Sequence, residues 1–194
     1  VVLLNELLDE VTATALDGIQ KRNNGSSNRD ESVEDDLVLA EQLGVGSVIF
    51  NDLRHDRQKD IEFDPDTART LEVGGSIYVQ YTNSRINSIL GKAEDIEVGV
   101  EIPGELFREE KNVLMQIARF PQVIKDAAES NSPHKVATYL TDFCKFINEM
   151  YHNLPILKAE TPEQRIFRLK LIQGAQQVIR NSSKIVQIEL PDRI

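Results

Sequence analysis

The stretch SPHKVATYLTDFCKFINEM, residues 132–150, decides the fold class of this sequence. Apolar residues recur in it at alternating steps of four and three: Val136, Leu140, Phe143, Ile147 and Met150. That spacing puts them on one side of an α-helix, as in the seam of a helical bundle. Ser132 is suited to the N-cap and Pro133 to the first helical position. The stretch therefore predicts a core helix of a bundle.

Helical periodicity continues on both sides of this stretch. Ahead of it we expect helices at residues 2–22, 33–44, 46–53, 78–92, 106–118 and 121–128. The apolar cluster at 46–53 would also suit a strand, and that alternative stays open. Residues 161–164 form a capping box with a proline at the first helical position, which predicts the start of the last long helix.

The pair Gly74-Gly75 is the clearest break in the pattern, and we place a domain boundary there. Residues 1–75 are expected to form a small helical unit with a short β-strand at 61–63, where polarity alternates. Residues 76–194 are expected to form an all-helical bundle. Residues 23–32 are rich in Asn, Gly and Ser, so we predict a mobile surface loop. The predicted fold class is mostly α.

Charge is distributed unevenly along the chain. The net charge is −10 overall, and residues 1–75, with 17 acids and 7 bases, account for all of it. Residues 76–194 are neutral, and residues 135–194 carry 9 bases and 6 acids. Binding of a polyanion is therefore expected only toward the carboxy terminus.

No catalytic or metal-binding set is visible. His55, His134 and His152 have no metal-ligand spacing to one another or to Cys144. The acidic series from Asp56 to Asp66 lacks the central glycine and the closing glutamate of a calcium loop. The single cysteine allows no disulfide within the chain and is predicted to be a small buried hydrophobic residue. We expect no catalytic residue and no metal site.

The amino-terminal sequence and the cysteine usage bear on cellular location. No apolar run approaches the roughly 18 residues needed to cross a bilayer. The start has no basic region typical of a signal peptide, and a lone cysteine suits a reducing cytoplasm. The chain also lacks an initiator methionine, so we expect a fragment of a longer, cytoplasmic protein.

Function is indicated by a set of short strings that follow one another in order. They are Asn51-Asp52-Leu53, Lys59–Asp64, Tyr78–Arg85 (YVQYTNSR), Ala118–Pro121, Tyr139-Leu140, Tyr151-His152, Arg180-Asn181 and Pro191–Ile194. Together they resemble blocks of the arginyl-tRNA synthetases, and YVQYTNSR is similar to the Y-V-Q-Y-x-H-x-R signature of that family. Each string is short, but their common order across nearly the whole chain makes the resemblance specific.

The resemblance implies the carboxy-terminal portion of a class I synthetase, with residues 76–194 as the anticodon-binding bundle. The partners it implies are the anticodon arm of tRNA(Arg) and an upstream catalytic domain, with no membrane and no DNA. The intact enzyme would attach arginine to tRNA using ATP and magnesium, whereas the fragment would hold no cofactor and be inactive. Four positions depart from the family pattern: Pro65, Asn83, Ser182 and Ile194.

An anticodon-binding surface needs aromatic faces for bases, polar groups for base edges and cations for phosphates. We predict that Tyr81 stacks on a base, with core packing as its alternative. Arg85 lies one turn further on and would contact a phosphate or base, or pair with a glutamate. Tyr151 is either a base contact or a core tyrosine with a solvated hydroxyl. The surplus of cations near the start of the last helix makes Arg165, Arg168 and Lys170 the best phosphate candidates. The resemblance adds Asn83, Arg180, Asn181, Arg193 and Ile194 as expected tRNA contacts.

Structural roles remain open for several of these residues. Arg165, Arg168 and Lys170 could be ordinary solvated charges, and Arg180 and Asn181 could cap the last helix. Arg193 and Ile194 are expected to form a free tail beside that helix. Two other functions also remain open: the equivalent bundle of another class I synthetase, such as the cysteine enzyme, and a helical protein-interaction module with no RNA role.

Overall fold

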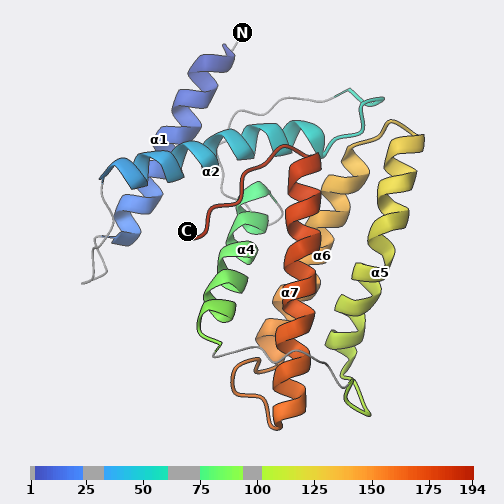
Figure 1. The fold of residues 1–194 in the computed structure, drawn as a ribbon. Coiled ribbons are helices and arrows are strands. Elements are labelled where there is room, and N and C mark those ends of the chain that lie inside the picture. The colour runs from blue at the N-terminus through green and yellow to red at the C-terminus, as the bar shows by residue number, and fades with distance from the viewer. Residues whose placement is uncertain (1–2, 24–32, 61–74, 94–101) are drawn as a thin grey trace.

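The computed structural model describes residues 3–23, 33–60, 75–93 and 102–194, and within these ranges the regular secondary structure is six helices. They are α1 (Leu4–Asn23), α2 (Val33–Leu53), α4 (Ser76–Gly91), α5 (Arg108–Glu129), α6 (His134–Asn153) and α7 (Pro162–Ile185). Helices α4 to α7 lie side by side as a bundle (Figure 1). Helix α2 crosses one end of the bundle, and α1 packs along the part of α2 that projects beyond it (Figure 1).

The predicted break at Gly44 is wrong, because α2 is one continuous helix from Val33 to Leu53. A Cβ atom on Gly44 would lie only 2.9 Å from the backbone nitrogen of Thr12 on α1. The glycine therefore permits close approach of two helix backbones and does not end a helix. The strand alternative for residues 46–53 is also wrong, because these residues lie within α2.

Helix α5 is also continuous, although the sequence predicted two helices separated before Pro121. A proline inside a helix removes one backbone hydrogen bond and costs about 3 kcal/mol. Here the ring of Pro121 is exposed, and apolar residues on both sides of it, including Val113 and Ala127, pack into the core. This burial on both sides of Pro121 favours one continuous helix.

The two helix starts that we predicted from sequence differ in outcome. Thr161 is the N-cap of α7, and its hydroxyl accepts a hydrogen bond from the Gln164 backbone at 3.3 Å. Helix α6, by contrast, begins at His134, one residue later than predicted. The Ser132 hydroxyl donates to the Ser130 carbonyl at 3.0 Å and caps nothing, so the predicted Ser132 N-cap is wrong.

The core of the bundle is built as the apolar spacing predicted. Val136, Leu140, Phe143, Ile147 and Met150 are all buried, together with residues from α4, α5 and α7. Phe50 of α2 belongs to the same cluster, so α2 contributes to the core of the bundle as well as to the pair that it forms with α1.

Some sequence predictions fall on residues outside the described ranges, namely the strand at 61–63 and most of the loop at 23–32. The division into units 1–75 and 76–194 stays a prediction. No helix in the described part of the chain is long and apolar enough to span a membrane.

Candidate functional site

Helices α4 and α6 bring together three residues that the sequence placed in one site. The guanidinium carbon of Arg85 lies 4.6 Å from the ring centre of Tyr81 and 4.7 Å from that of Tyr151. Arg85 also donates to the Tyr81 hydroxyl at 2.9 Å and to Asn148 Oδ1 at 2.6 Å. Tyr81 is 45% exposed and Tyr151 43% exposed, so the core alternatives are wrong for both. We call Tyr81, Arg85 and Tyr151 the tyrosine–arginine cluster.

A polar layer beneath the cluster joins α4 to α6. Asn148 donates to the Thr82 hydroxyl at 2.8 Å and to the carbonyl of Cys144 at 3.0 Å. Cys144 is fully buried, as predicted, and burial raises the pKa of its thiol to about 12 while a hydrogen bond with Thr82 opposes that shift. Because Asn148 holds both Arg85 and Thr82, it fixes where the Arg85 guanidinium lies between the two rings.

Arg168 does not fit the prediction of a phosphate contact. It is 2% exposed, and its Nε donates to the buried carboxylate of Glu110 at 2.7 Å. Its Nη1 donates to the carbonyl of Pro155 at 2.7 Å, and its guanidinium carbon lies 5.4 Å from the ring centre of Phe107. With its donors used inside the bundle, Arg168 is a structural residue, and we remove it from the candidate site.

Asn83 is likewise unsuited to the predicted RNA contact, because it is 1% exposed. Its side chain accepts a hydrogen bond from Gln176 at 3.3 Å and donates to the carbonyl of Pro191 at 3.5 Å. It therefore attaches the carboxy-terminal segment to α4, and the asparagine at this position serves packing within the protein.

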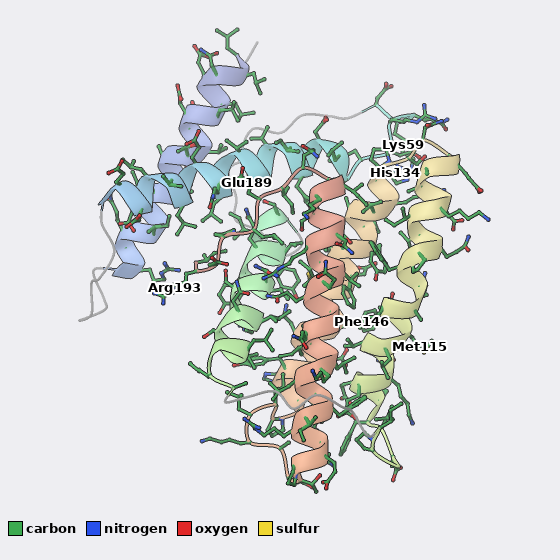
Figure 2. The ribbon with its side chains drawn as sticks, in the orientation of Figure 1. Lys59, Met115, His134, Phe146, Glu189 and Arg193 are labelled. Atoms are coloured by element: carbon green, nitrogen blue, oxygen red, sulfur yellow. The ribbon has the colours of Figure 1, made fainter. Side chains whose placement is uncertain are left out.

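The prediction of a free tail at Arg193 and Ile194 is wrong. Residues 187–194 run back along α4 toward α1 and α2 (Figure 1). Ile194 packs on the apolar cluster of Ala15, Ile19, Ala40 and Leu43 between α1 and α2. Figure 2 shows Glu189 close to α2 and Arg193 toward α1. The tail is thus part of the folded structure, with Ile194 partly buried against α1 and α2.

The remaining candidate cations lie along α7. Lys170 and Arg165 are partly exposed near its start, and Arg180 and Asn181 are exposed near its end. Among the described residues no ion pair involves Arg165, Lys170 or Arg180. Asn181 accepts a hydrogen bond from Gln177 at 2.8 Å. These residues stay candidates for phosphate or base contact, but no contact in the structure joins them to the tyrosine–arginine cluster.

Sequence reasoning missed Asn148 as a member of the site. Asn148 lies on α6 between Cys144 and Tyr151, and its side chain bonds Arg85 and Thr82 on α4. A polar side chain at such a position is a usable signal, because buried amides are kept where they are hydrogen-bonded.

A family model described as the DALR anticodon binding domain matches residues 79–194. Over its full length the chain is 33% identical to an arginine–tRNA ligase of Alkaliphilus metalliredigens and covers 33% of it. It is 34% identical to the enzyme of Haloarcula marismortui over 97% of the chain and 32% of that relative. The chain thus spans about a third of the length of the curated relatives it matches.

Solved structures agree on the fold. Thermus thermophilus arginyl-tRNA synthetase superposes with a TM-score of 0.85 at 26% identity, over 100% of this chain and 32% of that one. The Plasmodium falciparum arginyl-tRNA synthetase gives 0.82 at 24% identity, over 100% of this chain and 34% of that one.

The helical bundle and the family model that matches it identify an anticodon-binding domain. The chain belongs to the DALR anticodon binding domain family.

Proposed function

We propose that residues 76–194 hold the anticodon arm of tRNA(Arg), and that the intact protein attaches arginine to that tRNA. Support comes from the names of the full-length relatives, which are arginine–tRNA ligases. The observation that carries the proposal is the tyrosine–arginine cluster, two half-exposed aromatic rings with a cation between them. Unstacked loop bases bind on such faces, and a guanidinium binds phosphates and base edges.

In the free protein Arg85 lies over the rings of both tyrosines, with its guanidinium carbon under 5 Å from each ring centre. A base that enters between Tyr81 and Tyr151 must displace it, whereas a base on an outer face stacks without moving it. The cluster is therefore organised for stacking before binding, which lowers the entropy that binding costs.

Phosphate contacts would come from α7, because Arg165, Lys170 and Arg180 have no acidic partner among the described residues. Residues 135–194 carry a surplus of three positive charges, while the acidic charge of the chain lies in residues 1–75. This separation would direct a polyanion to the bundle and away from α1 and α2.

ATP and magnesium would serve the intact enzyme. We expect the chain alone not to form arginyl-adenylate, so pyrophosphate exchange with arginine, ATP and tRNA should stay at background. A cytoplasmic location and an upstream catalytic domain as partner complete the proposal. Exchange above background in the pure chain would contradict it.

The test is fluorescence anisotropy with a hairpin that has the anticodon arm of tRNA(Arg), titrated with the chain across a salt series. The comparison is a hairpin with the anticodon loop of tRNA(Cys) on the same stem. We expect the first to bind more tightly, with a negative slope of log affinity against log salt from counterion release. Tighter binding of the tRNA(Cys) hairpin would favour the cysteine enzyme, equal binding of both would contradict recognition of the tRNA(Arg) anticodon, and no binding of either would favour a protein-interaction module.

A further inference from the structure

Helix α4 has two functional faces. Tyr81 and Arg85 lie on one side, and at about 100° per residue the polar residues Gln80, Asn83 and Asn87 lie on nearly the opposite side. Gln80 and Asn83 are buried, and Asn87 is partly buried. Buried amides on a helix need partners, and here the partner is the carboxy-terminal tail, residues 187–194.

The tail is bound to α4 by a row of side-chain hydrogen bonds to its backbone carbonyls. Gln80 Nε2 donates to the Glu189 carbonyl at 2.9 Å, and Ser84 Oγ donates to the Pro191 carbonyl at 3.0 Å. Asn87 Nδ2 donates to the Asp192 carbonyl at 3.3 Å and to its side chain at 3.2 Å. These bonds recur about once per helical turn, so they follow the tail along α4.

Helix α7 sets the orientation of two of these amides. Gln176, 5% exposed, donates to the side-chain oxygens of Asn83 at 3.3 Å and Asn87 at 2.5 Å. With their oxygens used as acceptors, the two asparagines present their NH₂ groups to the tail carbonyls. The row is therefore a network in which loss of one member leaves others unpaired.

On its other side the tail contacts the α1–α2 pair. Gln42 on α2 donates to the Glu189 carboxylate at 2.9 Å. At the end of the tail, Ile194 packs with the cluster that Ala15 and Ile19 of α1 form with α2. Helix α1 otherwise packs chiefly against α2, so the tail is a second link between this pair and the bundle.

We propose that residues 187–194 form a strap that couples RNA binding at the tyrosine–arginine cluster to the packing of α1 on α2. The proposal rests on the proposed function, since it takes RNA as the ligand of the cluster. RNA on Tyr81 and Arg85 restrains α4, and the amides on the far side of α4 then hold the tail in place. Because the tail also holds Ile194 among the side chains of α1 and α2, the restraint reaches α1.

Hydrogen exchange of α1 backbone amides, followed by mass spectrometry on the full chain, tests this strap. The test variant is Gln42→Ala with Asn87→Ala, which removes the Gln42–Glu189 bond on one side of the tail and both Asn87–Asp192 bonds on the other. The matched control is Gln122→Ala with Asn112→Ala on α5, neither of which contacts the tail. Without RNA, we expect α1 to exchange several-fold faster in the test variant than in the wild type and the control. Equal exchange in all three proteins would overturn the strap.

The second part adds the tRNA(Arg) anticodon hairpin at saturation. In the wild type and the control we expect slower exchange in α1, and in the test variant unchanged exchange although the hairpin still binds. Binding to the wild type without slower exchange in α1, or equal slowing in the test variant, overturns the coupling alone. If the wild type binds no hairpin, the proposed function fails and the coupling with it, while the RNA-free comparison still decides whether the tail holds α1.

Discussion

Two arginines of the bundle, Arg168 and Arg85, have similar partners and opposite roles. Each lies over an aromatic ring, and each donates to an oxygen acceptor of a neighbouring helix or loop. Arg168 is 2% exposed and paired with a buried carboxylate, whereas Arg85 lies between two half-exposed tyrosines and has no carboxylate partner among the described residues. The first charge is neutralised inside the protein, and the second has no counterion among the described residues.

The comparison indicates that a cation's ability to bind RNA depends on whether a carboxylate already pairs with it, more than on its position in a motif. A buried ion pair contributes little net free energy but is costly to break, because one charge is then left without its partner. A cation held only by neutral oxygens and aromatic faces keeps its attraction for phosphate. The predictions below test whether the two arginines differ in this way.

The largest expected effect is on folding. Arg168→Ala should lower the free energy of unfolding by about 3–5 kcal/mol, because it leaves the Glu110 carboxylate buried and unpaired. Urea unfolding followed by circular dichroism measures this. The control is Arg168→Met combined with Glu110→Leu, which removes both charges and should recover part of the loss. If Arg168→Ala keeps wild-type stability and instead weakens RNA binding, the assignment of Arg168 as structural is wrong.

The next effect is on RNA affinity. Tyr81→Ala should weaken binding of the anticodon hairpin by about 1–3 kcal/mol, the usual range for one stacked base. Because Tyr81 is 45% exposed, the melting temperature should change little. Met115→Ala is the matched control, since Met115 is 61% exposed on α5, whereas the cluster lies on α4 and α6. A large fall in the melting temperature of Tyr81→Ala would show that Tyr81 packs in the core.

A third prediction concerns the layer beneath the cluster. Burial raises the pKa of the Cys144 thiol to about 12, so the folded protein binds this proton more tightly than the unfolded chain. Stability should therefore fall as pH rises from about 9 toward 12, by at most about 1.4 kcal/mol per pH unit. Urea unfolding at several alkaline pH values, compared with Cys144→Ala, isolates this effect. If the free energy of unfolding fell equally with pH in both proteins, the effect could not be assigned to the Cys144 thiol.

The smallest effect is expected on α7. Lys170→Ala should weaken binding of all hairpins alike and reduce the salt slope by about one, as for a single phosphate contact. Stability should be nearly unchanged because the side chain is partly exposed and has no ion pair among the described residues. A salt series in the anisotropy assay measures the slope. An unchanged slope would remove Lys170 from the site.

Much of the fold could be predicted because apolar residues recur at helical spacing in the sequence, and these residues are buried. The row Val136, Leu140, Phe143, Ile147 and Met150 predicted a core helix and forms one. The failures came at Gly44 and Pro121, where local preference favours a break and tertiary packing keeps the helix whole. A sequence does not state which backbone will approach a glycine, and here it is that of Thr12 on α1.

The site was predictable in part. Tyr81, Arg85 and Tyr151 were named from short strings, and the structure brings them together although 66 residues separate Arg85 from Tyr151. Asn83 was named from one of these strings and Arg168 from the local surplus of cations, and both are buried. Their burial could not be predicted because their partners, Gln176 and Glu110, are distant in the chain. Spacing along one helix predicts which side a residue faces, but not which charge or amide lies across from it.

The central claim is that loop bases stack on the tyrosine–arginine cluster, and one titration tests it most directly. The wild type and Tyr81→Ala with Tyr151→Ala are each titrated with two RNAs, the tRNA(Arg) anticodon hairpin and the same hairpin with abasic loop nucleotides. We predict that the wild type binds the intact hairpin more tightly, and that the double variant binds both with the weaker affinity. Equal affinity of the wild type for the two hairpins would contradict the account.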